Sequence, residues 1–404
     1  MKNILKYLPV LLGLLPVSCG KMMFDDGSKS VDMDVDRMVL VYMAADNNLA
    51  MFAKKNIEEM KKGDVPYYFD DGSGDVLLVY ADIAGEEPRL MRLSKDRFGT
   101  VTEETLRVYE DQNSCSDSVM TDVLSYASAL FPSMESGLVL WSHGTGWLPE
   151  GYYSNPVYAS SDGGAAYQHH IVDPYADLVK SFGEDGGSEM DIRALAKALP
   201  VHYSFILMDA CLMGGIEVAY ELRDCCDYFI GSAAEVLANG FPYEQVVGEF
   251  FDGERGLRNA CRLFYEHYED EGATVSMVDT RRLDALAYAG RAVFASKRGS
   301  IQDLDMSSIQ GYYRMDRHWF YDLDDFIFQL TYAEDSALYE DFKETLDDAV
   351  VCKYTTDEFV LNGYPQFSIN KFSGLSTYIP NPENPILDEY YRTLAWNKAV
   401  MMVE

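Results

Sequence analysis

Apolar runs alternate with amphipathic stretches along most of the chain from residue 37 onward. A short continuous apolar run predicts a buried strand, and apolar residues at every third or fourth position predict a helix that packs on a sheet. The predicted strands are residues 37–45, 76–83, 138–141, 205–208, 228–232 and 274–278, and the predicted helices are 49–61, 116–131, 191–199 and 215–222. This alternation predicts an α/β fold whose central sheet is mostly parallel and is covered by helices on both faces.

Two parts of the chain depart from this alternation. Residues 148–189 are rich in Gly, Ser, Tyr and Asp and have little periodicity, which predicts a long functional or mobile loop. After residue 300 the pattern is helical around 322–346 and then strand-like at 366–369 and 374–379. Because there is no internal repeat and no clear linker, we expect residues 37–404 to form one domain with a C-terminal elaboration.

The N-terminal segment has the pattern of an export signal. Lysines precede an apolar segment that is too short for a transmembrane helix and that ends in Ser18, Cys19 and Gly20. A cysteine after a small residue is similar to a bacterial lipobox, which makes 1–19 a signal peptide, Cys19 the lipid attachment site and 20–36 a flexible tether. The prediction is an exported protein anchored at the cell envelope, at the outer membrane, that contacts the membrane only through this lipid. A conventional signal peptide is the alternative.

Composition narrows the classes of partner. The chain has 66 acidic and 33 basic residues and a net charge of −33, so nucleic acids and anionic membrane surfaces are repelled and cationic groups are attracted. An acidic surface also keeps proteins soluble, so the charge does not identify a substrate. The sequence holds no CxxC pair and no HExxH motif, and we therefore expect no transition-metal site.

Two apolar runs end in residues with catalytic chemistry. The run that starts at Gly137 ends at His143, and the run that starts at Tyr203 ends at Cys211. Ligand crevices in open α/β sheets lie at the carboxyl ends of the strands, so neighbouring strands would bring this imidazole and thiol together. An imidazole can take the proton of a thiol, and the thiolate is a strong nucleophile. From these residues alone, a structural histidine and an inert core thiol are the alternatives.

Several segments resemble the clostripain family of cysteine peptidases, which belongs to the caspase-like clan. VYMAADNNL, WSHGTGW and MDACLMGGIEVAYEL occur in the family's order, and GSAAEVLANGFPYE and GLSTYIP also resemble family segments, so the similarity extends over residues 37 to 380. The resemblance implies a caspase-like three-layer sandwich and an endopeptidase that forms a thioester. It makes Cys211 the nucleophile and His143 the residue that protonates the leaving amine. The amides of Gly144 and Cys211 would form the oxyanion hole.

The resemblance also implies a protein or peptide substrate with Arg or Lys at P1, the residue before the cleaved bond. Asp209 matches the family's acidic residue two positions before the nucleophile, and its carboxylate would pair with the P1 cation. A helix N-cap or a buried hydrogen-bonding role is the alternative for Asp209. Where the family often has a second acidic residue this chain has Asn239, which makes a basic P1 less secure, and Glu235 is the nearby acid that could reach inward.

Two further expectations come from relatives. Many are zymogens that cleave themselves between the histidine and the cysteine, and Lys180 is the only lysine or arginine in residues 148–189, which makes it the self-processing candidate. An ordinary surface lysine is the alternative. Some relatives need calcium, and clusters at 70–71 and 322–325 could supply oxygen ligands, although charged solvent-facing loops are the simpler interpretation. No other cofactor is expected.

A different class of function is open to the same fold. A caspase-like lipoprotein that has lost turnover could serve as a binding or scaffold protein at the cell envelope, because a changed specificity pocket often accompanies a changed function. The presence of both His143 and Cys211 favours the peptidase.

Overall fold

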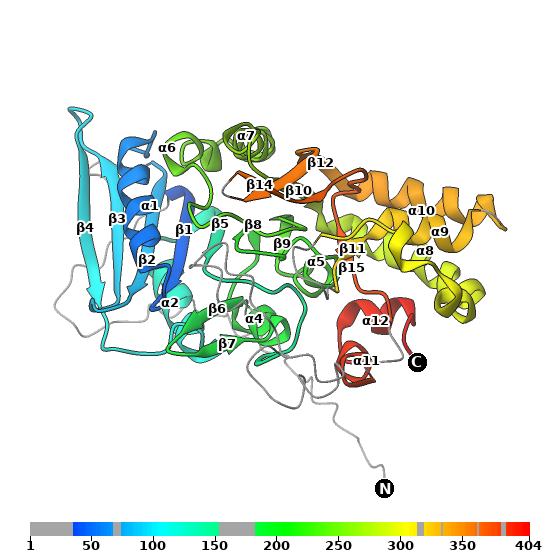
Figure 1. Ribbon diagram of the computed structural model, residues 1–404. Coiled ribbons are helices and arrows are strands. Elements are labelled where there is room, and N and C mark those ends of the chain that lie inside the picture. The colour runs from blue at the N-terminus through cyan, green and yellow to red at the C-terminus, as the bar shows by residue number, and fades with distance from the viewer. Residues whose placement is uncertain are drawn as a thin grey trace, which may run out of the picture. The chain divides into compact units, whose positions relative to one another are not determined.

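The centre of the structure is a nine-stranded sheet with the strand order β12-β10-β9-β8-β5-β1-β2-β3-β4 (Figure 1). The structure is a computed structural model that describes residues 35–67, 74–152, 182–312, 319–332, 334–361, 363–380 and 385–404. Several predictions therefore lie outside the described residues: the signal peptide 1–19 with lipid attachment at Cys19, the tether as far as residue 34, self-processing at Lys180, and the acidic pair Asp70 and Asp71.

Five neighbouring strands in the middle of the sheet are parallel to one another. They are β1 (Val35–Ala45), β2 (Val76–Ile83), β5 (Ser133–Trp141), β8 (Tyr203–Asp209) and β9 (Cys226–Gly231). Every residue of β2 is buried, because helices cover both faces of this part of the sheet and leave no polar side. The prediction of an α/β fold around a parallel core is confirmed.

Antiparallel strands extend both edges of the sheet, so the sheet as a whole is mixed. On one side are β10 (Thr274–Asp279) and β12 (Val350–Thr355), and on the other are β3 (Arg89–Lys95) and β4 (Val101–Val108). The sequence did not predict β3, β4 or β12. The residues of β4 are mostly exposed, and an edge strand of this kind has no apolar run to mark it.

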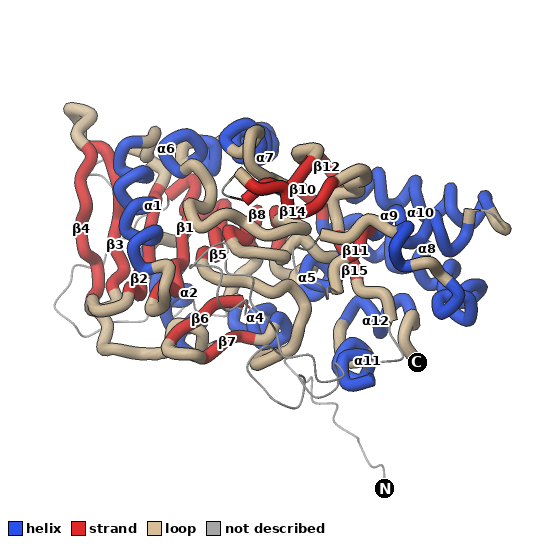
Figure 2. The backbone as a smooth tube through the Cα atoms, in the orientation of Figure 1, coloured by secondary structure: helices blue, strands red, loops and turns tan. Residues whose placement is uncertain are grey.

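Helices form a layer on each face of the sheet (Figures 1 and 2). One layer contains α1 (Ala50–Lys62), α6 (Tyr243–Val246) and α7 (Gly253–His267), whose apolar residues share a core cluster with Val39 and Val41 of β1. The opposite layer contains α2 (Asp117–Leu130), α4 (Ile192–Ala198) and α5 (Ile216–Glu221), which pack with Leu40 and Tyr42. Successive side chains of β1 therefore point into the cores on opposite faces of the sheet, as strand geometry requires.

The C-terminal region adds helices and short strand pairs beside this sandwich. Its helices are α8 (Leu283–Lys297), α9 (Leu323–Thr331), α10 (Ser336–Ala349), α11 (Pro385–Tyr391) and α12 (Ala395–Val400), and its short strands are β11 (Tyr321–Asp322), β13 (Glu358–Leu361), β14 (Tyr364–Ser368) and β15 (Ser376–Thr377). The helical stretch predicted at 322–346 is two helices, because Asp335 starts a new one by accepting a hydrogen bond from the Leu338 amide.

A buried carboxylate joins this C-terminal region to the helix that follows Cys211. Glu217 of α5 is fully buried, and its Oε1 accepts hydrogen bonds from the Thr377 hydroxyl, the Tyr378 amide and the Tyr391 hydroxyl. Burial raises the pKa of Glu217 in spite of these donors. The C-terminal region thus helps to hold α5, the helix that follows Cys211, in place.

A hairpin stands at the end of the segment that the sequence predicted to be irregular. It consists of β6 (Phe182–Asp185) and β7 (Ser188–Met190) and turns at Gly186 and Gly187, whose φ values are 53° and 91°. A two-residue turn with positive φ at both positions matches the twist of a hairpin, which explains the glycine pair. The prediction of a loop through residue 189 is wrong for these residues.

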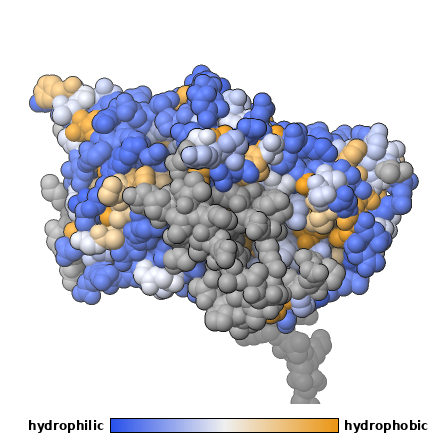
Figure 3. Space-filling model, in the orientation of Figure 1, coloured by the Kyte–Doolittle hydropathy of each residue, from blue (hydrophilic) through white to orange (hydrophobic). Residues whose placement is uncertain are grey.

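The described surface is largely hydrophilic in the view of Figure 3, in line with the high acidic content, and hydrophobic residues are scattered over it. Among the described residues, no helix has the length and apolar character needed to cross a membrane.

Candidate active site

His143 and Cys211 lie just beyond the carboxyl ends of two adjacent parallel strands. In the last paired row of β5 and β8, Trp141 lies opposite Asp209. His143 and Cys211 each follow their residue of this row by two positions. The Ser142 amide donates to the Asp209 carbonyl over 3.4 Å and continues the pairing by one step. The register of the sheet therefore brings both candidates to the same level, at the carboxyl ends of β5 and β8.

The loop after His143 packs directly on the backbone of the other strand end. A Cβ atom at Gly144 would lie 2.6 Å from the carbonyl oxygen of Cys211, and one at Gly146 would lie 2.6 Å from that of Leu212. Such distances are too short for a side chain, so only glycine permits this approach. Leu212 has a φ of 60°, a conformation that costs about 1 kcal/mol for a residue with a side chain. It makes the chain turn sharply immediately after Cys211.

Among the described residues, Asn48 and Glu184 contact the ring of His143. Asn48 Oδ1 lies 2.7 Å from Nε2, and Glu184 Oε2 lies 3.8 Å from the same nitrogen. An amide oxygen only accepts hydrogen bonds, so this contact requires a proton on Nε2 and makes Nδ1 the nitrogen that can accept one. The hairpin sets the position of Glu184, because the Gly183 amide donates to the His143 carbonyl over 3.0 Å.

Neither Asn48 nor Glu184 was predicted as a site residue. Asn48 is the second asparagine of the VYMAADNNL segment and stands before Leu49, and an asparagine after a strand could have served as the signal. Glu184 had no signal, because the fold of residues 182–190 was not predicted.

The thiol of Cys211 lies against the backbone of residue 236. The Val236 amide donates to Sγ over 3.3 Å, and Sγ lies 3.4 Å from the Val236 carbonyl oxygen. The N–H donor stabilises a thiolate, and the carbonyl oxygen accepts the S–H of the neutral thiol, so the two contacts suit both protonation states of Cys211. The side chain is half-buried and so remains accessible. The oxyanion-hole role of the Gly144 and Cys211 amides stays a prediction.

Asp209 ends β8 beneath residues 237–243. Its side chain is buried, and Oδ2 accepts hydrogen bonds from the Phe241 amide over 3.1 Å and from the Tyr243 hydroxyl over 2.8 Å. Within the described chain, the buried Oδ1 has no hydrogen-bond partner. Burial raises the pKa of Asp209 to about 6. A buried carboxylate oxygen without a donor is costly, and a cation that reached it would remove that cost. These contacts are not those of a helix N-cap, and they are those of a buried hydrogen-bonding residue, the other alternative for Asp209.

The comparison with protein families gives a match to the clostripain family over residues 41–401. The chain belongs to the clostripain family. It is therefore a cysteine peptidase. An inactive zymogen C11 protease from Parabacteroides distasonis is 33% identical with a TM-score of 0.76, and the match covers 91% of this chain and 99% of that one. A secreted C11 cysteine protease from Bacteroides thetaiotaomicron, solved with an irreversible peptide inhibitor, is 32% identical with a TM-score of 0.74, over 90% and 98% of the two chains. Curated proteins give no significant match.

In this clostripain-family peptidase, Asn239 stands close to Asp209 and is tied to helix α1. The neighbouring Gly240 has a φ of 66°, and a Cβ atom there would lie 2.6 Å from Asp209 Oδ2. The Asn239 side-chain oxygen accepts a hydrogen bond from Lys55 Nζ over 2.9 Å, and its carbonyl accepts one from Asn56 Nδ2 over 2.9 Å. The turn thus covers the Asp209 carboxylate and presents the neutral amide of Asn239.

The other predicted acidic residues are Glu235 and the cluster at 322–325. Glu235 is half-exposed in the loop that precedes the turn. Asp322 is buried and accepts hydrogen bonds from the Tyr312 hydroxyl and the Ser373 amide, while Asp325 is buried and pairs with Lys371. The interpretation of Asp322 and Asp325 as solvent-facing is therefore wrong. Within the described ranges, no group of three His, Cys, Asp or Glu side chains could hold a metal ion.

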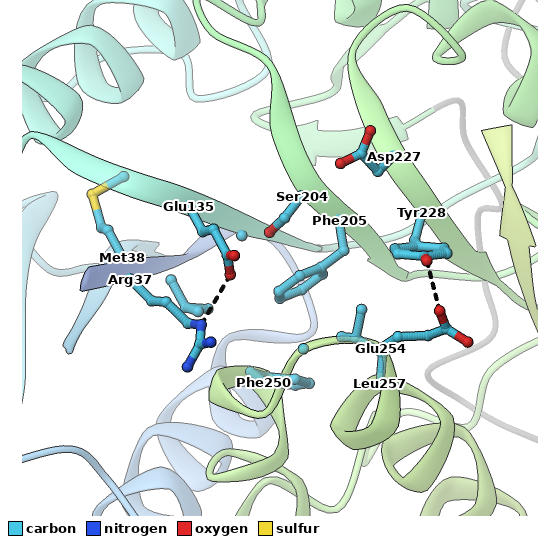
Figure 4. A pocket seen from close by; sticks show the side chains of 13 residues that line it. Arg37, Met38, Glu135, Ser204, Phe205, Asp227, Tyr228, Phe250, Glu254 and Leu257 are labelled. Carbon is cyan, nitrogen blue, oxygen red and sulfur yellow. Dashed lines mark hydrogen bonds and ion pairs between the residues drawn. The ribbon is translucent and has the colours of Figure 1, made fainter. Parts of the chain in front are cut away.

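A separate pocket lies at the other end of the same strands, at the amino ends of β1, β5 and β8 (Figure 4). It has a volume of about 210 Å³ and is lined by two polar pairs, Arg37 with Glu135 and Tyr228 with Glu254. His143 and Cys211 follow the carboxyl ends of their strands, so this pocket is distinct from the candidate active site.

Proposed function

We propose that the chain is an endopeptidase that uses Cys211 and His143 as a catalytic dyad and cleaves after Arg or Lys. The observation that carries this proposal is the shared offset of the two residues from the Trp141–Asp209 row. Two residues at equal distance beyond a paired row of parallel strands share one stretch of the sheet edge, where α/β enzymes bind their ligands.

The chemistry follows from the groups at this edge. The Cys211 thiolate attacks the peptide carbonyl carbon, a C–S bond forms, and the carbonyl electron pair moves to oxygen, where the Gly144 and Cys211 amides donate hydrogen bonds. The C–N bond then breaks, and His143 gives its proton to the leaving amine. Water attacks the thioester, His143 takes a proton from this water, and the thiolate leaves as the acid product forms. Asn48 keeps the imidazole in one orientation during both steps.

A basic P1 residue is supported by the unsatisfied oxygen of Asp209. Asp209 is a buried carboxylate, and its Oδ1 lacks a hydrogen-bond donor within the described residues. A guanidinium or ammonium group is suited to supply that donor. A neutral P1 side chain would leave that oxygen unsatisfied, and the loss of binding would be large because the site is closed to water.

The proposal includes export and activation. Residues 1–20 support export with lipid attachment at Cys19, and one similar structure is of a secreted protease. Another is of an inactive zymogen, which supports activation by cleavage, and we propose Lys180 as the site of self-cleavage. An intact loop in fully active protein, seen by mass spectrometry, would exclude Lys180.

The test is a set of fluorogenic peptides that end in Arg, Lys, Asp or Asn, given to the protein and to its Cys211→Ala variant. We expect cleavage after Arg or Lys and none in the variant, a loss of about 10⁴-fold or more. Cleavage after another residue would keep the dyad and reject the basic P1. No turnover, even after limited nicking of the loop with trypsin, would favour the binding or scaffold protein.

A further inference from the structure

Helix α1 carries an acidic side chain next to the turn where the second acid is missing. Asn56 Nδ2 donates to Glu59 Oε2 over 3.0 Å and also to the Asn239 carbonyl over 2.9 Å. The Asn56 amide is itself fixed, because it is fully buried and its oxygen accepts a hydrogen bond from Trp141 Nε1 over 3.0 Å. One rigid amide thus places the Glu59 carboxylate beside residue 239.

Glu59 is also within electrostatic reach of the buried carboxylate of Asp209. Its charge contributes to the raised pKa of Asp209 and to the raised pKa of Tyr243, which donates to Asp209. The Glu59 side chain is 20% exposed, so it is partly withdrawn from water and its charge is incompletely screened. Asp209 and Glu59 therefore act on the same small region, from β8 and from α1.

A cation of the chain itself already stands at this place. Lys55 Nζ lies 2.9 Å from Asn239 Oδ1 and 3.4 Å from Glu59 Oε1. The Lys55 side chain is 53% exposed, so this contact is weak and the ammonium group can move into water at small cost. An ordinary i,i+4 pair on a helix has no second contact of this kind with a loop of the substrate site.

We propose that Glu59 is the second acidic residue of the P1 pocket and that Lys55 occupies, in the free protein, the place that a P1 Arg or Lys takes in the complex. This proposal rests on the proposed basic P1 specificity. It explains how the pocket can have a second acid although residue 239 is neutral. The negative charge comes from the adjacent helix, and Asn239 contributes a neutral oxygen acceptor. The P1 cation meets Asp209 at one end of the pocket and Glu59 with Asn239 at the other.

Two variants on α1 test the proposal, because they should change kcat/KM for Arg and Lys peptides in opposite directions. Glu59→Gln should lower kcat/KM for Arg and Lys peptides about 10-fold, because a charged acceptor is lost. Lys55→Met should raise it about 2- to 5-fold, because a weak competing cation is removed. Peptides with norleucine at P1 should respond to neither change. Glu58→Gln and Lys54→Met are matched controls, since these residues pair with Lys61 and Glu86 and should leave all rates unchanged.

A second experiment guards against a loss caused by misfolding. Adding Asn239→Asp to the Glu59→Gln variant returns a carboxylate to the pocket from the loop, and we expect it to restore at least half of the lost kcat/KM. If Glu59→Gln behaves like Glu58→Gln while Asp209→Asn strongly lowers kcat/KM for Arg peptides, the inference fails and the basic P1 pocket stands. If the unmodified protein cleaves only after uncharged residues, both fail.

Discussion

In the proposed catalytic corner, residues 143–146 and 211–214, the candidate reactive groups follow two adjacent strands, and the backbones of the two segments touch. In the proposed P1 pocket, Asp209, Asn239 and Glu59 come from β8, from a loop and from α1. Asn56 of α1 donates to Glu59 and to the Asn239 carbonyl, and Asp209 accepts from the Phe241 amide of the same loop. The corner is positioned by the hydrogen-bond ladder of the sheet, and the pocket by contacts between elements that are far apart in the sequence.

This difference has a consequence for how each region tolerates change. A shift in the corner disturbs the backbone of both strand ends, since Gly144 leaves no space beside Cys211. In the pocket, a charge can be supplied by any element that borders it, so a neutral residue at 239 is compatible with the same chemistry. We therefore expect changes in the corner to affect every substrate and changes in the pocket to affect only substrates with a cationic P1.

Among the three tests of this comparison, Gly144→Ala is expected to have the largest effect. The new Cβ atom would lie 2.6 Å from the Cys211 carbonyl oxygen, so the backbone must move, and the amides that we propose as oxyanion donors move with it. Loss of such a donor lowers kcat by about 100-fold or more, and the loss should be equal for Arg and norleucine peptides. Gly299→Ala is the matched control, because a Cβ atom there meets nothing within 4 Å. A Gly144→Ala protein with normal kcat would contradict the corner as described.

The same difference explains which parts of the site the sequence could predict. His143, Cys211 and Asp209 end or follow buried strands, and an apolar run that stops at a reactive residue is visible without a structure. Glu59 lies in an ordinary amphipathic helix, where an acid every few residues is expected, and nothing local distinguishes it from Glu58. Its position beside Asn239 depends on how α1 packs against the loop, which periodicity does not encode.

The second effect concerns pH and belongs to the pocket. Burial raises the pKa of Asp209 to about 6, so the carboxylate is charged above that pH and neutral below it. Because only the charged form attracts a P1 cation, kcat/KM for Arg peptides should fall as the pH drops through 6, by about 10-fold at pH 5 relative to pH 7.

Norleucine peptides separate this effect from titration of the dyad. They depend on Cys211 and His143 but not on the charge of Asp209, so the ratio of Arg to norleucine kcat/KM isolates the pocket. We expect this ratio to fall with the pH, and to be independent of pH in Asp209→Asn. A constant ratio in the unmodified protein would mean that Asp209 does not carry the P1 charge.

The smallest of the three effects is expected at Asn48, which contacts the His143 ring and acts through it. Asn48→Ala removes the acceptor that lies 2.7 Å from Nε2, and the ring loses its fixed tautomer. One neutral hydrogen bond corresponds to a decrease in kcat of about 5-fold, the same for Arg and norleucine peptides. Asn48→Asp keeps an oxygen at this position and adds a charge that stabilises the imidazolium, so it should retain activity and displace the pH profile of kcat upward. If both variants keep the original rate and profile, Asn48 only supports the loop, and the orientation of His143 is set by Glu184 and the hairpin.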